Sequence, residues 1–66
     1  MELNKLYKHK RTLDCAFGPT SIAETETGLD VQGHWYNVST SNITLLELDR
    51  ISISNEELPN WEVYDT

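Results

Sequence analysis

The residues best suited to chemistry in this chain are gathered in two short stretches. The first is YKHKR, in a segment that carries four of the five Lys and Arg residues of a chain whose net charge is −6. Lysine and arginine side chains bind phosphate, and a neighbouring tyrosine or histidine can contact a ring. This stretch therefore suggests an anion site. Its candidate ligand-binding residues are Tyr7, Lys8, His9, Lys10 and Arg11.

Two other interpretations of YKHKR predict the same local composition. Lysines on an edge strand discourage pairing with other chains. A basic strand can also contact the acidic segment NEELPNWEVYD of a neighbouring subunit. An anion pocket, a protected edge and a subunit contact are therefore three hypotheses for one stretch.

The second stretch is HWYN, which we expect to lie on a strand. Successive side chains of a strand point to opposite faces, so Trp35 is predicted in the core and Tyr36 on the other face. An aromatic ring beside hydrogen-bonding side chains can stack on a base and read its edge. The alternative is an ordinary exposed sheet face. The candidate binding residues here are His34, Trp35, Tyr36 and Asn37.

Catalytic and metal chemistry have little support in the sequence. Cys15 has no local signature of an activated thiol, and the two histidines, His9 and His34, do not lie at a metal-ligand spacing from it. We therefore expect neither an enzyme nor a bound metal or cofactor. Broad nucleic-acid binding is also not expected, because it needs many Lys and Arg contacts to phosphate.

The pattern of β-branched and aromatic runs broken by turn residues predicts a mainly β fold in one domain, residues 1–66. About five strands would form a small SH3-like barrel or a strongly bent antiparallel sheet. Turns are predicted at Gly18-Pro19 and around Gly28 and Asp30. The predicted strands cover 3–13, 20–27, 31–39, 43–53 and 61–65.

One short helical turn is predicted near residues 55–58. Ser54 and Glu57 have the spacing of a capping box, and Pro59 is expected to end the turn.

Size and composition suggest self-association. A 66-residue chain has a small core, and a single cysteine cannot form an internal disulfide, so a homo-oligomer would add buried area. The chain has no apolar stretch of the kind found in a signal peptide or membrane span, and a free thiol fits a reducing cytoplasm.

The beginning KLYKHKRT and the end EELPNWEVYDT, around a short all-β middle, resemble small proteins encoded by tailed bacteriophages. Among these are the viral sponge proteins, which counter CBASS or Thoeris defence by sequestering a cyclic nucleotide signal without cleaving it. The resemblance covers the two ends and the overall length. It implies a homo-oligomer in the host cell cytoplasm that binds a cyclic dinucleotide or a cyclic ADP-ribose isomer. In such a protein YKHKR would lie near phosphate, and Trp35, Tyr36 and Asn37 near a base.

A different class of function remains open. The chain could be an acidic inhibitor that binds a host protein, in the manner of a DNA mimic, with Arg50 as the one basic residue of its acidic half. A third interpretation, a minor structural protein of a virion, depends only on size and fold. The acidic residues in question are Glu47, Asp49, Glu56, Glu57, Glu62 and Asp65.

Overall fold

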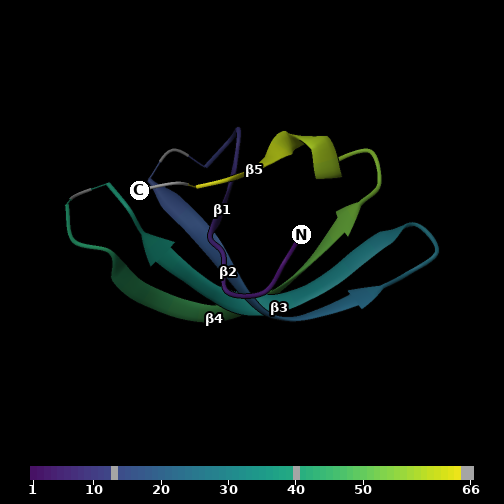
Figure 1. Cartoon of the computed structure of the whole chain (residues 1–66), viewed down its shortest axis with the longest axis horizontal. Coiled ribbons are helices and arrows are strands. Elements are labelled where there is room, and N and C mark those ends of the chain that lie inside the picture. Colours follow the sequence, from purple (N-terminus) through teal and green to yellow (C-terminus); the bar gives the residue numbers. More distant parts are fainter. Residues whose placement is uncertain (13, 40, 65–66) are drawn as a thin grey trace.

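The computed structural model describes residues 1–12, 14–39 and 41–64 of the chain. It shows one antiparallel sheet of five strands in the order β4-β3-β2-β1-β5 (Figure 1). A short 3-10 helix, η1, precedes the last strand. The elements are β1 (Tyr7–His9), β2 (Cys15–Glu24), β3 (Gly28–Asn37), β4 (Thr44–Ser54), η1 (Leu58–Asn60) and β5 (Trp61–Val63).

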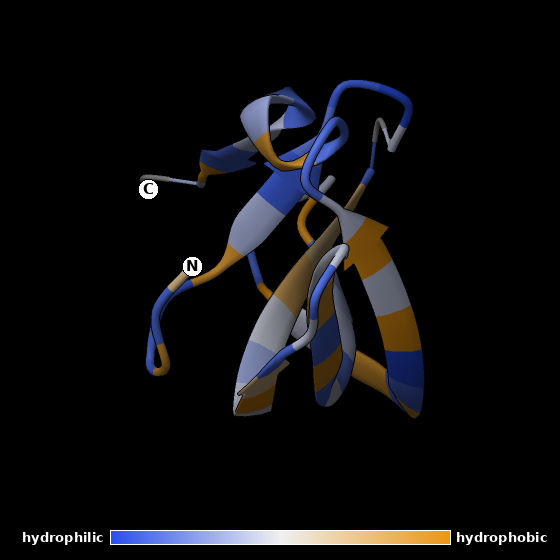
Figure 2. Ribbon diagram, turned by 90° about the vertical axis from the view of Figure 1, so that its right-hand side faces the viewer, coloured by the Kyte–Doolittle hydropathy of each residue, from blue (hydrophilic) through white to orange (hydrophobic). Residues whose placement is uncertain are grey.

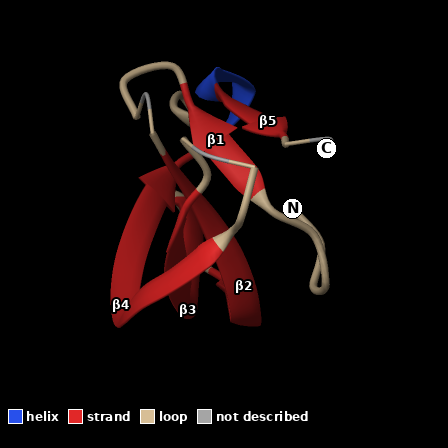
Figure 3. Cartoon of the chain, turned by 90° about the vertical axis from the view of Figure 1, so that its left-hand side faces the viewer, coloured by secondary structure: helices blue, strands red, loops and turns tan. Residues whose placement is uncertain are grey.

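The sheet is strongly bent. The long strands β2, β3 and β4 curve together, and β1, β5 and η1 lie over their concave side (Figures 1 and 3). The sheet does not close, because β4 and β5 are at its two ends and are not paired with each other. The prediction of a mainly β fold with five strands is confirmed, and of its two forms the open bent sheet is the one observed.

Two irregularities in strand pairing accompany the bend. The register of β2 against β3 shifts between Pro19 and Ser21, and that of β3 against β4 shifts between His34 and Tyr36. An extra residue on one strand increases the local twist and bends the strand. Gly33 lies at the first shift, where a side-chain carbon would collide with the carbonyl oxygen of Gly18.

The turn predicted at Gly18-Pro19 is wrong, because both residues lie inside β2. Proline has no N–H to donate, and it is tolerated here because the register shift begins at this residue. Gly18 has a packing role, since a Cβ at this position would lie 2.9 Å from Cε2 of Tyr36. The absence of a side chain thus lets the Tyr36 ring approach the strand.

The turn predicted around Gly28 and Asp30 is also misplaced, because both residues belong to β3. The chain reverses between the end of β2 at Glu24 and the start of β3 at Gly28. The N–H of Thr25 donates to the carbonyl oxygen of Gly28 at 2.8 Å, and the Thr25 hydroxyl accepts from the N–H of Gly28 at 3.0 Å.

The helical turn is found at Leu58–Asn60, a few residues after the predicted 55–58. The Ser54 hydroxyl accepts from the N–H of Glu57 at 3.3 Å, but this contact precedes η1, whose capping residue is Glu57 and has no side-chain capping bond. Pro59 lies within the turn and does not end it. This placement is favourable because the first N–H groups of a helix have no partner inside it.

The core lies between the concave face of the long strands and the elements that cover it. Its fully buried centre is Phe17, Val31 and Ile53, and Trp35 and Trp61 pack against this cluster. Figure 2 shows the alternation of hydropathy along the strands that gives the sheet one apolar inner face. The predicted core position of Trp35 is therefore confirmed.

Candidate functional site

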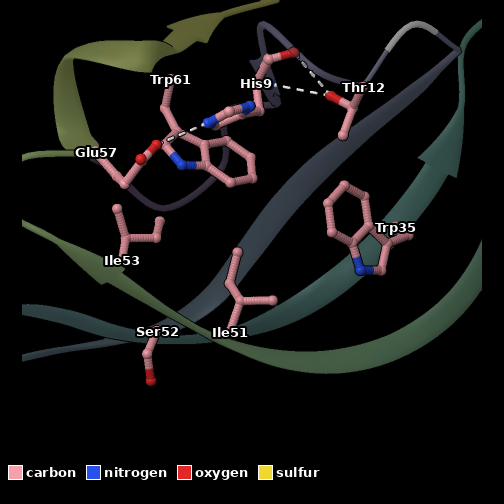
Figure 4. A pocket seen from close by; sticks show the side chains of 8 residues that line it. All are labelled: His9, Thr12, Trp35, Ile51, Ser52, Ile53, Glu57 and Trp61. Carbon is pink, nitrogen blue, oxygen red and sulfur yellow. Dashed lines mark hydrogen bonds and ion pairs between the residues drawn. The ribbon is translucent and has the colours of Figure 1, made fainter.

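A cleft opens between the covering elements and the concave face of β4. Its volume is about 220 Å³ (Figure 4). Because two indole rings form part of its wall, we call it the tryptophan cleft. The residues that line it are His9, Thr12, Trp35, Ile51, Ser52, Ile53, Glu57 and Trp61.

One wall of the tryptophan cleft is the inner face of β4. Ile51 pairs with Val31 across the sheet, so both side chains point to the core side. Ile53 lies two residues further on the same face. Ser52 alternates to the other side, where its hydroxyl donates to Asp30 Oδ1 at 2.7 Å, and Figure 4 shows it pointing away from the space.

The opposite wall comes from the pairing of β1 with β5. His9 and Trp61 are cross-strand partners, so their rings meet on one face of this pair. The ring centroids are 5.1 Å apart with an angle of 70° between the planes, an edge-to-face contact. Trp35 lies at one end of the cleft, with its ring centroid 6.3 Å from that of Trp61.

A tight turn from His9 to Thr12 forms the rim. The N–H of Thr12 donates to the carbonyl oxygen of His9 at 3.0 Å, and the Thr12 hydroxyl accepts from the His9 N–H at 3.1 Å. Lys10 and Arg11 occupy the middle of this turn. Both are exposed and do not line the cleft themselves, but His9 and Thr12 on either side of them do, and we call this turn the basic rim.

The His9 ring is fixed at both nitrogens. Its Nδ1 accepts the N–H of Arg11 at 3.0 Å, so in the neutral ring the proton is on Nε2. Nε2 then donates to Glu57 Oε2 at 3.1 Å. The histidine therefore links the rim turn to the segment before η1.

Glu57 is a carboxylate at neutral pH. The hydrogen bond from His9 holds its pKa below the ordinary value, and a second bond from Asn60 Nδ2, at 3.0 Å, acts in the same direction. The side chain is 47% exposed, so it faces the open part of the cleft. Figure 4 shows it at the end opposite Trp35.

A residue of β4 fixes the orientation of the Trp35 ring. Its indole N–H donates to Asp49 Oδ2 at 2.9 Å, and its ring packs edge-to-face on Phe17 with centroids 5.0 Å apart. The bond from Trp35 lowers the pKa of Asp49, and a bond from the Arg50 N–H lowers it further. These contacts fix the ring before any ligand binds.

The structure divides the YKHKR residues between several places. His9 lines the tryptophan cleft, and Lys10 and Arg11 lie at its rim. Tyr7 is buried, and its hydroxyl accepts from the N–H of Glu2 at 2.7 Å, so its role is structural. Lys8 lies on the other face of β1, with Nζ 5.6 Å from the centroid of the Tyr64 ring.

The HWYN residues are divided in the same way. Only Trp35 reaches the cleft. His34 and Tyr36 lie on the convex face of the sheet, with their ring centroids 6.4 Å apart. Asn37 stabilises the following turn, since its Oδ1 accepts from the N–H of Ser39 at 2.9 Å and from the Ser39 hydroxyl at 2.7 Å.

Tyr36 lines a second cavity of about 250 Å³, away from the cleft. Lys5 is also part of its lining, but its ammonium group is paired with Glu2 at 2.7 Å. This cavity therefore combines one predicted aromatic residue with a lysine that already has a carboxylate partner.

The residues that sequence reasoning missed are Thr12, Ile51, Ser52, Ile53, Glu57 and Trp61. Glu57 had been interpreted as part of a capping box and as one acidic residue of the DNA-mimic hypothesis, and Trp61 only as part of the last strand. Their proximity to His9 follows from the pairing of β1 with β5. In the sequence, the one indication that His9 and Glu57 could be neighbours was that a histidine N–H can donate to a carboxylate.

The acidic residues of the DNA-mimic hypothesis come from several elements. Glu47 and Asp49 lie on β4, at one end of the sheet, and Glu62 lies on β5, at the other. Glu62 is also the cross-strand partner of Lys8. Asp65 lies outside the described residues.

Two features are absent from the part of the chain that the structure describes, a metal-holding cluster and a membrane-spanning helix. Within residues 1–12, 14–39 and 41–64 there is no group of three or more His, Cys, Asp or Glu side chains that could hold a metal ion. The same residues form no helix long and apolar enough to cross a membrane.

Comparison with models of protein families, with curated proteins and with solved structures finds no match to this chain. The geometry of the tryptophan cleft is therefore the basis for a functional proposal.

Proposed function

We propose that the chain is a non-enzymatic binding protein that sequesters a cyclic nucleotide signal, with one base of the ligand in the tryptophan cleft. The observation that carries the proposal is the combination of an aromatic cleft with a basic rim. Both tryptophans of the chain belong to the wall of this cleft. The role as a phage-encoded anti-defence protein in the host cytoplasm is part of the same proposal, and its support is the resemblance of the two chain ends.

The size of the cleft supports a single ring system. Pockets that bury a drug-sized ligand have volumes of about 300–1,000 Å³, and this cleft has about 220 Å³. A base would stack against Trp61 and Trp35 and contact Ile51 below. Stacking of a base on an aromatic side chain contributes about 1–3 kcal/mol.

The rim supports the position of the phosphates. Lys10 and Arg11 lie on the turn whose two ends line the cleft, so the phosphate of a nucleotide whose base is in the cleft can reach them. Hydrogen bonds between a charged donor and a phosphate are about twice as strong as neutral ones. In a chain of net charge −6, this local positive charge would offset the general repulsion of an anion.

A homo-oligomer is the second part of the proposal. Leu45 and Leu48 are 58% and 56% exposed, and they pair with Tyr36 and His34, which places all four on the convex face. Exposed apolar side chains gathered on one face are typical of an interaction surface. We expect this face to contact a second copy of the chain.

The test is intrinsic tryptophan fluorescence during titration with cyclic dinucleotides and cyclic ADP-ribose isomers. Since both tryptophans line the cleft, a bound base should quench most of the signal. The double variant Lys10→Ala/Arg11→Ala should weaken binding, and Lys8→Ala is the matched control because Lys8 lies on the other face of β1. If no compound of the panel binds at tens of micromolar, the proposal is wrong.

A further inference from the structure

Glu57 has an orientation that the proposed function does not yet use. Both of its hydrogen bonds, from His9 Nε2 and from Asn60 Nδ2, go to the same oxygen, Oε2. A carboxylate has about four acceptor sites on its two oxygens, so the two sites of Oε1 are left for a ligand. The two bonds also hold the group at a fixed place in the lining of the cleft.

We propose that Glu57 makes the tryptophan cleft selective for a guanine ring. An ionised carboxylate only accepts hydrogen bonds, so it favours a ring edge with adjacent donors. Guanine presents N1–H and the N2 amino group side by side, and both donors can point at Oε1, because Oε2 already accepts from His9 and Asn60. This inference rests on the proposed function and names the base that the cleft would hold.

The other bases fit the carboxylate less well. Adenine presents its N6 amino group next to the unprotonated N1, and cytosine presents N4 next to N3. In both cases a ring nitrogen lone pair would face the negative charge. Uracil offers a single N–H between two carbonyl oxygens. A wrong edge leaves a group without a partner, and one bidentate pair of this kind discriminates by about 1–3 kcal/mol.

The charge distribution of the cleft supports this orientation. Glu57 lies at the end of the cleft opposite Trp35. Lys10 and Arg11 lie on the exposed turn between His9 and Thr12, and the charge of Arg11 helps to lower the pKa of Glu57. A base edge directed at Glu57 would leave its sugar and phosphate toward the rim. The ionised state of Glu57, maintained by His9 and Asn60, makes its bonds to the base charge-assisted.

A cation is the competing occupant. Tryptophan faces with a nearby carboxylate also bind quaternary ammonium groups. The basic rim argues for the nucleotide, because Lys10 and Arg11 would repel a cation entering past them. The two occupants are separated by including a trimethylammonium compound, choline, among the probes.

The experiment is a fluorescence titration of the wild-type chain with cyclic di-GMP, cyclic di-IMP, cyclic di-AMP and choline. We expect cyclic di-GMP to bind on the order of tenfold to a hundredfold more tightly than cyclic di-AMP. Cyclic di-IMP lacks the N2 amino group and should lie between them. This series uses only the natural chain, so it does not depend on whether a variant folds.

The variant Glu57→Gln should remove the preference for guanine, so that cyclic di-GMP and cyclic di-AMP bind with similar affinity. Glu56→Gln is the matched control, because Glu56 is the adjacent acid and does not line the cleft. Thermal melting of both variants shows whether the fold is retained.

Each outcome has a distinct meaning. Equal binding of the guanine and adenine compounds overturns the role of Glu57 and leaves the proposed function standing. Binding of none of the nucleotides overturns the preference for guanine, and it overturns the proposed function as well if the cyclic ADP-ribose isomers also fail to bind. Binding of choline that is lost in Glu57→Gln identifies a cation site and also overturns both.

Discussion

The concave and convex faces of this sheet are made from alternating residues of the same strands, yet they differ in almost every property. The concave face carries the core, two tryptophans and a carboxylate fixed by two hydrogen bonds. The convex face carries Tyr36 and His34 beside exposed leucines of β4. Trp35 and Tyr36 are adjacent in sequence and lie on opposite faces.

This difference shows which side chains a protein of this size can hold in a fixed position. A side chain on the concave face is held by covering elements that come from both ends of the chain. A side chain on the convex face, such as Tyr36, borders only the N-terminal segment besides its own sheet. We therefore assign ligand binding to the concave face and association between copies to the convex face.

The change with the largest expected effect is Phe17→Ala, which removes the packing under Trp35 on the concave face. Phe17 is fully buried, and such a substitution costs about 3–5 kcal/mol. Since small domains have a total stability of about 5–15 kcal/mol, most of it would be lost. Urea unfolding followed by circular dichroism gives the value, and a loss below about 1 kcal/mol would contradict the described core.

The next change is Trp61→Leu, which keeps an apolar side chain against the core and removes one wall of the cleft. We expect nucleotide affinity to fall by roughly tenfold to a hundredfold, since base stacking contributes about 1–3 kcal/mol. The comparison is Tyr36→Leu, the equivalent removal of an aromatic ring on the convex face. Similar losses in both variants, measured by calorimetry, would mean that the ligand is not confined to the concave face.

A smaller effect on the monomer is expected for Leu48→Lys on the convex face. The side chain is 56% exposed, so the free energy of unfolding should change by no more than about 0.5 kcal/mol. The added charge should instead shift the chain toward the monomer in analytical ultracentrifugation. An unchanged sedimentation profile of an oligomeric wild type would exclude this face as the contact.

The smallest expected effect is on how stability falls in acid, to which Glu57 and Asp49 on the concave side contribute. Hydrogen bonds from His9 and Trp35 lower the pKa of Glu57 and Asp49 below ordinary values of 4.5 and 3.8. A carboxyl group with a lowered pKa stabilises the fold above its unfolded value, and this contribution is lost as the pH falls through the folded pKa. Glu57→Gln and Asp49→Asn should each flatten the decrease below about pH 4.5 in thermal melts. Glu56→Gln should leave the decrease unchanged.

The parts of the fold that depend on local alternation could be predicted from the sequence. The division of Trp35 from Tyr36 is an example, because a strand places successive side chains on opposite faces. The Gly18-Pro19 turn was predicted wrongly because a register shift lets these residues remain within a strand. The sequence signal for this shift is Gly33 on the partner strand, because a glycine inside a strand often marks a bulge or a close approach of another backbone.

Six of the eight residues that line the cleft could not be predicted, for a different reason. His9 contacts Glu57 and Trp61 because β1 pairs with β5, and these strands lie at opposite ends of the chain. Local periodicity says which face a side chain uses but not which distant strand lies beside it. The basic residues were therefore recognised, and the carboxylate and second indole that accompany them were not.

The two strands that form the upper wall of the cleft have only three residues each, and this length has a consequence for motion. Short segments near the ends of a chain open locally at a free-energy cost below that of global unfolding. An occupant that contacts both this wall and β4 would tie the two ends of the chain to the middle. The backbone amides of β1 and β5 should then exchange with solvent deuterium more slowly when the cleft is filled. The affinity of the cleft would accordingly include the cost of holding these two ends in place.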